Sequence, residues 1–242
     1  MSLLELVAVS KRYGGVLALD QVSFTVEAGT IVGVMGANGA GKTTLFALIA
    51  GNERPSGGEV RFAGRSLAGL RPDQIARRGV ARTFQVVRPF AGLSVRENVL
   101  AGALFGTRAF ASAALARRAA DAIVEEAGLG GQADRLAGTL TLSGQKRLEV
   151  ARAIATGARL VMLDEVMAGL LPAEVDEMLA TLHALQRARG LTLLVIEHVM
   201  QALMRLSQRI VVLHLGALIA QGSPEEVAAD PEVQRLYFGE TA

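Results

Sequence analysis

A glycine-rich loop constrains this chain more than any other segment. Residues 36–43 read Gly-Ala-Asn-Gly-Ala-Gly-Lys-Thr, and they lie between an apolar run at 31–35 and a helix-like stretch at 45–50. Glycines allow consecutive backbone N–H groups to turn toward the β- and γ-phosphates of a nucleotide, and the N-terminus of a helix adds partial positive charge. Lys42 adds a full charge, and the Thr43 hydroxyl is suited to hold Mg²⁺. The pattern predicts a strand, a loop and a helix that together bind a nucleoside triphosphate.

An ordinary glycine turn between a strand and a helix is the alternative for this segment. Only three lysines occur in the 242 residues, and one of them is Lys42, so composition alone would seldom produce the match. We therefore favour phosphate binding. The loop residues expected to surround the nucleotide are Gly36, Asn38, Gly39, Gly41, Lys42 and Thr43.

Composition limits the class of protein. Hydrophobic residues make up 51% of the chain, which is enough for the core of one large domain. The absence of cysteine excludes disulfides and thiolate metal sites. The N-terminal residues lack the features of a signal peptide and the apolar runs are too short to span a bilayer, so we expect a cytoplasmic protein. The net charge is +2 with scattered arginines, so we expect no nucleic-acid partner.

Short apolar strands alternate with amphipathic stretches, which predicts an α/β fold with helices on the faces of a mixed sheet. The expected strands are 4–9, 22–26, 31–35, 59–62, 80–84, 160–163, 192–196, 210–213 and 217–220. Between residues 95 and 157 this strand signal is replaced by Ala/Leu/Arg/Glu segments with glycine breaks. We therefore predict one domain over 1–242, with a nucleotide-binding core at 1–90 and 159–242 and a helical subdomain at 91–158. Pro172 suits the first turn of a helix that runs toward Gly190.

Two carboxylates follow a buried-strand pattern at 160–163. A strand that ends in Asp164 and Glu165 is typical of sites that present an acid to a magnesium nucleotide. Asp164 would hold Mg²⁺ through water, and Glu165 would polarise the attacking water. A solvated turn is the alternative when the pair is considered alone.

Three further side chains are candidates whose individual signals are weaker. His198 follows a second buried run at 193–196, where α/β sheets gather ligands, although such a histidine is more often a surface or capping residue. Gln85 follows the expected strand at 80–84, and its amide suits contact with water and Mg²⁺; the alternative is a polar strand end. Tyr13 is one of two tyrosines and could stack on adenine, or serve only in packing.

Taken in chain order, these features resemble the ATPase subunits of ABC transporters over nearly the whole chain. The residues that carry the resemblance are Tyr13, the loop at 36–43, Gln85, the segment 140–152, Asp164, Glu165 and His198. The resemblance implies a P-loop NTPase core of the RecA type, with an N-terminal antiparallel β portion and an inserted α-helical subdomain. It also implies that ATP and Mg²⁺ bind at Lys42, Thr43 and Thr44, that Tyr13 stacks on adenine, and that Glu165 is the general base. Gln85 would then sense the nucleotide and the membrane partner, and His198 would be the switch histidine.

Four segments are similar to the branch of this family that takes up branched-chain amino acids: 79–85, 147–153, 164–170 and 196–200. The ending at 222–227 and 237–239 is similar to the closing segment of that branch. Relatives that serve urea, amides or aromatic acids, and an ATPase for lipopolysaccharide export, are also similar. The resemblance therefore implies import of branched-chain amino acids or a related small polar solute.

The chain departs from the family pattern at two places. The family signature is Leu-Ser-Gly-Gly-Gln; alignment without a gap places it at 140–144, and a shift of one residue makes 142–145 a shortened version. Either reading puts a hydroxyl and backbone amides near a helix start, as capping a γ-phosphate requires, so Thr141, Ser143, Gly144 and Gln145 are all candidates. A plain helix N-cap is the alternative for either hydroxyl. Leu171 stands where the loop after the catalytic acid usually carries Asp or Asn, so we expect either the coupling between two sites or the activity of one site to be altered.

The family geometry requires two ATPase subunits head to tail, as a homodimer or with a sister subunit. It also implies two transmembrane permease subunits, a separate solute-binding protein, and a location on the inner face of the cell membrane. Two alternatives remain from other classes. One is a soluble ATPase clamp that acts on nucleic acid or the ribosome, and the other is a nucleotide-gated scaffold that does not hydrolyse ATP.

Overall fold

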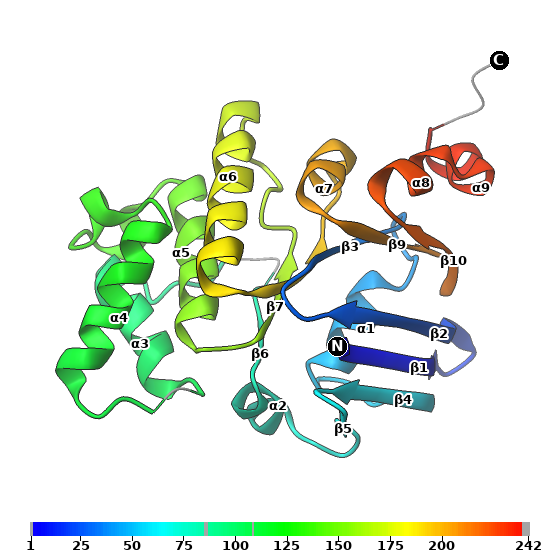
Figure 1. Ribbon diagram of the computed structural model, residues 1–242, viewed down its shortest axis with the longest axis horizontal. Helices are drawn as coiled ribbons and strands as arrows, with labels where there is room; N and C mark the ends of the chain where they lie inside the picture. Colours follow the sequence, from blue (N-terminus) through cyan, green and yellow to red (C-terminus); the bar gives the residue numbers. More distant parts are fainter. Residues whose placement is uncertain (1, 85–86, 108, 239–242) are drawn as a thin grey trace. The chain divides into compact units, whose positions relative to one another are not determined.

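The computed structural model describes residues 2–84, 87–107 and 109–238 (Figure 1). The chain divides into two units: residues 1–75 with 194–242 form the first, and residues 76–193 form the second. Helix α2 (Pro72–Arg78) and strand β8 (Thr192–Ile196) run across the divisions. Within the described ranges, no helix combines the length and apolar character needed to cross a bilayer.

An antiparallel sheet makes up one part of the first unit. Its strands, in the order β2-β1-β4-β5, are β2 (Val16–Glu27), β1 (Ser2–Tyr13), β4 (Gly57–Phe62) and β5 (Arg65–Ser66). Leu6 lies opposite Phe24 on one side and Val60 on the other, and all three side chains are buried. The expected strands at 4–9, 22–26 and 59–62 are therefore confirmed; the first two extend beyond both predicted ends, and the third begins two residues earlier than predicted.

A second group of strands in the first unit precedes the glycine loop. Strand β3 (Ile31–Met35) runs parallel to β9 (Arg209–His214), which pairs antiparallel with β10 (Ala217–Gly222). Every residue of β3 is buried, as its continuous apolar sequence predicts for a strand covered on both faces. The remaining helices of this unit are α1 (Lys42–Ile49), α7 (Met200–Leu206), α8 (Pro224–Ala229), α9 (Pro231–Val233) and the π-helical turn η3 (Gln234–Phe238).

The second unit contains the parallel pair β6 (Val80–Arg82) and β7 (Leu160–Asp164). The predicted strand at 80–84 is thus two residues too long. Thr83 N still donates to Met162 O, but Phe84 N donates to the Glu149 carboxylate at 2.8 Å. A helix side chain therefore replaces the neighbouring strand as the partner of this backbone, and the strand ends.

Helices form the rest of the second unit (Figure 1). They are α3 (Val95–Phe105), α4 (Ala113–Glu126), the short 3₁₀ turns η1 (Gly130–Gln132) and η2 (Ala137–Thr139), α5 (Leu142–Ala155) and α6 (Pro172–Arg189). Helices α3, α4 and α5 pack on one another. Helix α6 begins at Pro172 and stops at Gly190, whose φ of 61° is left-handed, as the sequence predicts. The division of the chain at residues 91 and 158 stays a prediction.

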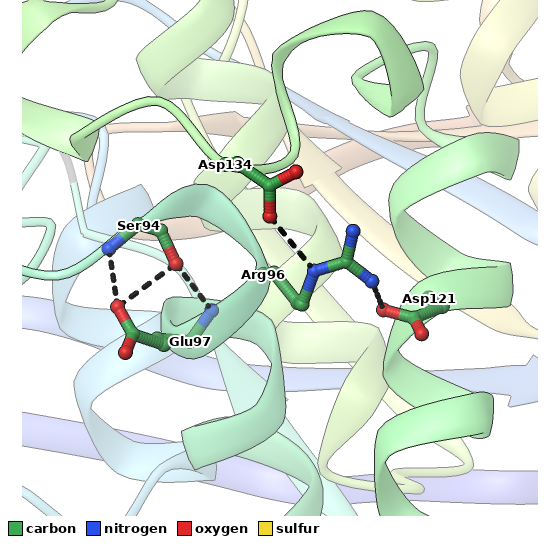
Figure 2. A network of polar contacts seen from close by, with 5 residues as sticks. All are labelled: Ser94, Arg96, Glu97, Asp121 and Asp134. Carbon is green, nitrogen blue, oxygen red and sulfur yellow. Dashed lines mark hydrogen bonds and ion pairs between the residues drawn. The ribbon is translucent and has the colours of Figure 1, made fainter.

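Two polar motifs fix the start of α3 (Figure 2). Ser94 and Glu97 form a reciprocal capping box, in which Ser94 N donates to the Glu97 carboxylate at 2.7 Å and Glu97 N donates to Ser94 Oγ at 3.2 Å. Arg96 pairs with Asp121 of α4 and, at 3.2 Å, with Asp134 in the segment that precedes η2. These contacts hold the first turn of α3 against α4.

Candidate nucleotide-binding site

The glycine loop joins the buried end of β3 to the first turn of α1. Gly39 and Gly41 have φ values of 80° and 103°, a backbone region that other residues seldom adopt. A Cβ at Gly41 would also lie 2.6 Å from Ala18 O, so side chains are excluded there by both conformation and space. The glycines at these two positions are therefore required by the turn itself.

Lys42 lies inside the loop that precedes it. Its side chain is buried, with the residue 6% exposed, and Nζ donates to Gly36 O at 2.6 Å and to Ala37 O at 3.0 Å. Helix α1 has no side-chain cap and no acidic residue in its first turn, while residues 37–39 and Thr43 are exposed. Exposed loop backbone, a lysine ammonium and an accessible hydroxyl therefore meet at one helix N-terminus, which favours an anion.

Backbone groups from the C-terminal strands support this loop. Gly216 N donates to Ala40 O at 3.1 Å, and Gly216 O accepts from Asp20 N at 2.9 Å. A Cβ at Gly36 would lie 2.7 Å from Leu213 O, so the end of β9 approaches the first residue of the loop very closely. The loop is thus held by the turn and the strand ends beneath it.

Tyr13 and His198 also belong to the first unit. Tyr13 is the last residue of β1 and is 42% exposed, with Lys11 Nζ 4.6 Å from the centre of its ring. Lys11 is in turn fixed by Glu53 at 2.8 Å and by Arg54 O at 2.9 Å. Lys11 therefore lies over one face of the ring, and the exposed remainder of Tyr13 is accessible to a ligand. His198 follows the end of β8 and is exposed.

Asp164 is the last residue of β7, in the second unit, and it is 4% exposed. Its Oδ2 lies 2.7 Å from Arg82 Nη2, at the end of the neighbouring strand β6. Asp164 N donates to Thr83 Oγ1 at 3.0 Å. Side chains thus bind the ends of β6 and β7 to each other, and the Arg82 guanidinium compensates the charge of the buried Asp164 carboxylate.

Glu165 has a strained backbone. Its φ is 54°, in the left-handed region, which costs a residue with a side chain about 1–2 kcal/mol. Its carbonyl accepts from Lys146 Nζ at 2.6 Å and from Ala168 N at 3.3 Å, so the strained peptide is fixed by two donors. The side chain itself is only half-buried. The left-handed backbone of Glu165 therefore turns the chain sharply immediately after the buried strand β7.

The signature segment starts helix α5. Thr141 is the N-cap residue: its Oγ1 accepts from Gly144 N at 3.2 Å, and its side chain is exposed. Ser143 is in the first turn and is buried. Gln145 Nε2 donates to Leu140 O at 3.0 Å. Gly144 is buried, and a Cβ there would lie 3.3 Å from the Leu140 side chain. The two candidate hydroxyls therefore differ in accessibility.

Sequence reasoning assigned no role to one row of charged residues on α5: Lys146, Glu149 and Arg152. Lys146 binds the carbonyl of Glu165, Glu149 accepts from Phe84 N, and Arg152 donates to Arg88 O at 2.9 Å and lies 4.7 Å from the Phe90 ring. The sequence did contain a signal, because residues three apart share a helix face and these three charges therefore form one row.

Burial is the main cause of the unusual ionisation in this row. It raises the pKa of Glu149, against the opposing effects of the Phe84 N–H and the nearby Arg152 and Lys146 charges. Burial also lowers the pKa of Arg152, and the Glu149 charge opposes this shift. Gln85 lies outside the described residues, so the role expected for it stays a prediction.

The predicted residues fall into one set in each unit. Tyr13, the glycine loop and His198 belong to the first, and Thr141, Ser143, Asp164 and Glu165 belong to the second. The donor set of the loop fits a magnesium nucleotide, because Gly36 and Gly41 admit no side chain, Lys42 supplies positive charge and Thr43 an oxygen. The α/β fold and this loop define a P-loop nucleotide-binding protein.

The family follows from comparison with known proteins. The ABC transporter family matches residues 19–168, and the branched-chain amino acid ATP-binding cassette transporter family matches residues 217–242. The chain therefore belongs to the ABC transporter family of ATP-binding proteins.

Individual relatives cover almost the full length. The chain is 41% identical over 250 residues to the high-affinity branched-chain amino acid transport ATP-binding protein BraF of Pseudomonas aeruginosa, with 98% of each chain covered. It is 33% identical over 240 residues to the lipopolysaccharide export ATP-binding protein LptB of Haemophilus influenzae, with 99% of this chain and 98% of that protein covered. Among solved structures, an ATP-binding cassette of an ABC transporter in its ADP conformation is 29% identical, with a TM-score of 0.87 and coverage of 99% and 100%.

Proposed function

We propose that this chain is the ATP-hydrolysing subunit of an ABC transporter and that two such subunits build the nucleotide sites. The observation that carries this proposal is the loop at the start of α1. Lys42 is buried against the loop carbonyls, whereas Asn38, Gly39 and Thr43 are exposed and open to a ligand. A triphosphate is the ligand whose charge and size match this set of donors.

The chemistry proposed for the site is positioning and charge stabilisation. Lys42 and the loop amides bind the phosphates, and Tyr13 offers its exposed ring to adenine. Thr43 and Asp164 hold Mg²⁺, which when bound supplies positive charge to the phosphate oxygens. Glu165 accepts a proton from the attacking water. Its fixed backbone supports this role, because Lys146 holds the Glu165 carbonyl while the carboxylate stays half-exposed.

We further propose that His198 and Gln85 help to orient the attacking water. The exposed position of His198 after β8 supports a contact with the γ-phosphate. Gln85 would face the metal and the membrane partner, and this part of the proposal rests on the resemblance alone.

The second half of each site is proposed to come from the partner's signature segment. Of the two candidate hydroxyls, the geometry favours Thr141, because it is exposed at the N-cap while Ser143 is buried in the first turn. The backbone amides at the start of α5 would bind the same anion ahead of Gly144 N and Gln145 N, which already donate to Thr141. Each Lys42 would then act with the partner's Thr141.

Import of a branched-chain amino acid or a related small polar solute is the transport function proposed. It is supported by the 41% identity to BraF and by the match of residues 217–242 to the branched-chain amino acid cassette family. The 33% identity to LptB makes lipopolysaccharide export a second candidate. Transport would require two permease subunits and, for import, a solute-binding protein, with this chain on the cytoplasmic face of the membrane.

Replacement of Glu165 by Gln tests the proposed base and the dimer together. The amide keeps the size of the side chain and removes the base, so MgATP turnover is expected to fall at least about 100-fold. Because hydrolysis no longer separates the subunits, MgATP is expected to shift the molar mass in light scattering from 25.3 kDa toward twice that value.

The exposed Glu125 on α4 provides a matched control, since Glu125→Gln makes the same chemical change away from the site. The control is expected to hydrolyse ATP like the parent. Parent-like turnover of Glu165→Gln would show that another group is the base.

A further inference from the structure

The phenol of Tyr237 touches the phosphate loop. Its Oη accepts a hydrogen bond from Ala37 N at 3.1 Å and donates one to Leu213 O at 2.9 Å. Ala37 is the second residue of the loop, Leu213 lies near the end of β9, and Tyr237 belongs to the turn η3 near the end of the described chain. One hydroxyl thus uses its proton and a lone pair to connect the loop to the strand beside it.

The backbone of Ala37 is held at both its N–H and its carbonyl. Its N–H is bound by Tyr237, and its carbonyl accepts from Lys42 Nζ at 3.0 Å and from Ala40 N at 3.1 Å. A bound phosphate competes for Lys42, because the ammonium must then share its donors with the anion. The Tyr237 contact does not involve Lys42, so it can keep the Ala37 peptide in place when the ammonium turns to a ligand.

The backbone around the Tyr237–Ala37 hydrogen bond is tightly packed, which leaves little room for another group to take the place of the Tyr237 hydroxyl. Gly36 lies against Leu213 O so closely that a Cβ would be 2.7 Å from it, and Gly216 N holds Ala40 O at 3.1 Å. Strand β9 and its following turn therefore already support the loop at two points, and Tyr237 adds the third at Ala37. The contact spans 200 residues of sequence.

We propose that Tyr237 is a positioning residue for nucleotide binding, which fixes the Ala37 peptide of the phosphate loop to the end of strand β9. This inference rests on the proposed function, since it assigns the loop to a nucleotide. Tyr237 touches no reacting atom; it acts through the shape of the loop. Its removal therefore weakens binding of the nucleotide more than it slows the chemical step.

The test is Tyr237→Phe in the full chain, which removes the hydroxyl and keeps the ring. Loss of the two hydrogen bonds predicts a Kd for MgADP about 5- to 30-fold weaker in calorimetry, which corresponds to about 1–2 kcal/mol at about 1.4 kcal/mol per tenfold change. The KM for ATP should rise by a similar factor while kcat stays within about twofold, since the groups proposed for the chemistry are unchanged. Hydrogen exchange at the Ala37 amide should become faster than in the parent.

Arg235→Ala provides the matched control, because Arg235 lies in the same turn with a 65% exposed side chain and is 3.9 Å from Glu232. It should leave Kd, KM and Ala37 exchange unchanged. Parent-like MgADP binding by Tyr237→Phe, or a fall in kcat at constant KM, would overturn the positioning role. A parent chain that binds no MgADP would refute the proposed function itself, and this inference with it.

Discussion

Arg82 is predicted to be essential for stability because of where its partner lies. The Arg82 and Asp164 side chains are 16% and 5% exposed and their charged atoms are 2.7 Å apart. At an effective dielectric constant near 20 the attraction at this distance is about 6 kcal/mol, and desolvation of both ions offsets much of it. Arg82→Gln leaves the buried Asp164 carboxylate without its cation, so we expect the free energy of unfolding to fall by about 3–5 kcal/mol.

Urea unfolding followed by far-UV circular dichroism measures this loss. In a double-mutant cycle, Asp164→Asn should restore much of the stability lost in Arg82→Gln, because the neutral pair leaves no buried charge. Arg71→Gln is the control, since Arg71 pairs with Asp73 at a similar 3.0 Å but both side chains are largely exposed; its midpoint should match the parent. A loss below about 1 kcal/mol in Arg82→Gln, or no coupling in the cycle, would refute the reasoning.

Three other substitutions give separate tests. Glu149→Gln tests how stability depends on pH. Burial raises the folded-state pKa of this carboxyl above its ordinary 4.5. Its favourable contribution to the free energy of unfolding is therefore present below pH 4.5 and is lost as the pH rises through the folded-state pKa. Thermal unfolding should therefore show Glu149→Gln gaining stability relative to the parent between pH 4 and pH 7, and a constant difference would contradict this. Leu171→Asp places an acceptor at the N-cap of α6, where Leu has none, and should stabilise the chain by about 1 kcal/mol in urea; an unchanged midpoint would contradict the cap. Gly41→Ala forces a Cβ toward Ala18 O at a φ of 103° and should abolish calorimetric binding of MgADP, and parent-like binding would show that the loop tolerates a side chain.

Local patterns were sufficient to predict the fold class and most strands. The apolar runs at β3, β7 and β8 are buried at every residue, as expected for strands covered on both faces. The glycine loop was equally readable, since a strand, two left-handed glycines and a helix follow directly from the residue types. These features are determined by residues close together in the sequence, so a local sequence pattern is enough to predict them.

Contacts between distant residues were not predictable in the same way. Phe84 leaves the strand because a carboxylate from α5, 65 residues later, takes its N–H. Tyr237 contacts the phosphate loop from 200 residues away, and the sequence comparison identified only the similarity of segment 237–239 to the family ending. The choice between Thr141 and Ser143 also required the position at which α5 begins. Thr141, at the N-cap, is exposed, whereas Ser143, two residues later, is buried. Such pairs are determined by tertiary packing.

Co-purification from native membranes tests the central claim most directly. The tagged chain, extracted in mild detergent with MgATP and the Glu165→Gln substitution to stabilise the dimer, should elute with integral membrane permease subunits at equal copy number, identified by mass spectrometry. Recovery of the chain with nucleic acid or ribosomes, or without any integral membrane protein, would contradict its assignment as the ATPase of a transporter.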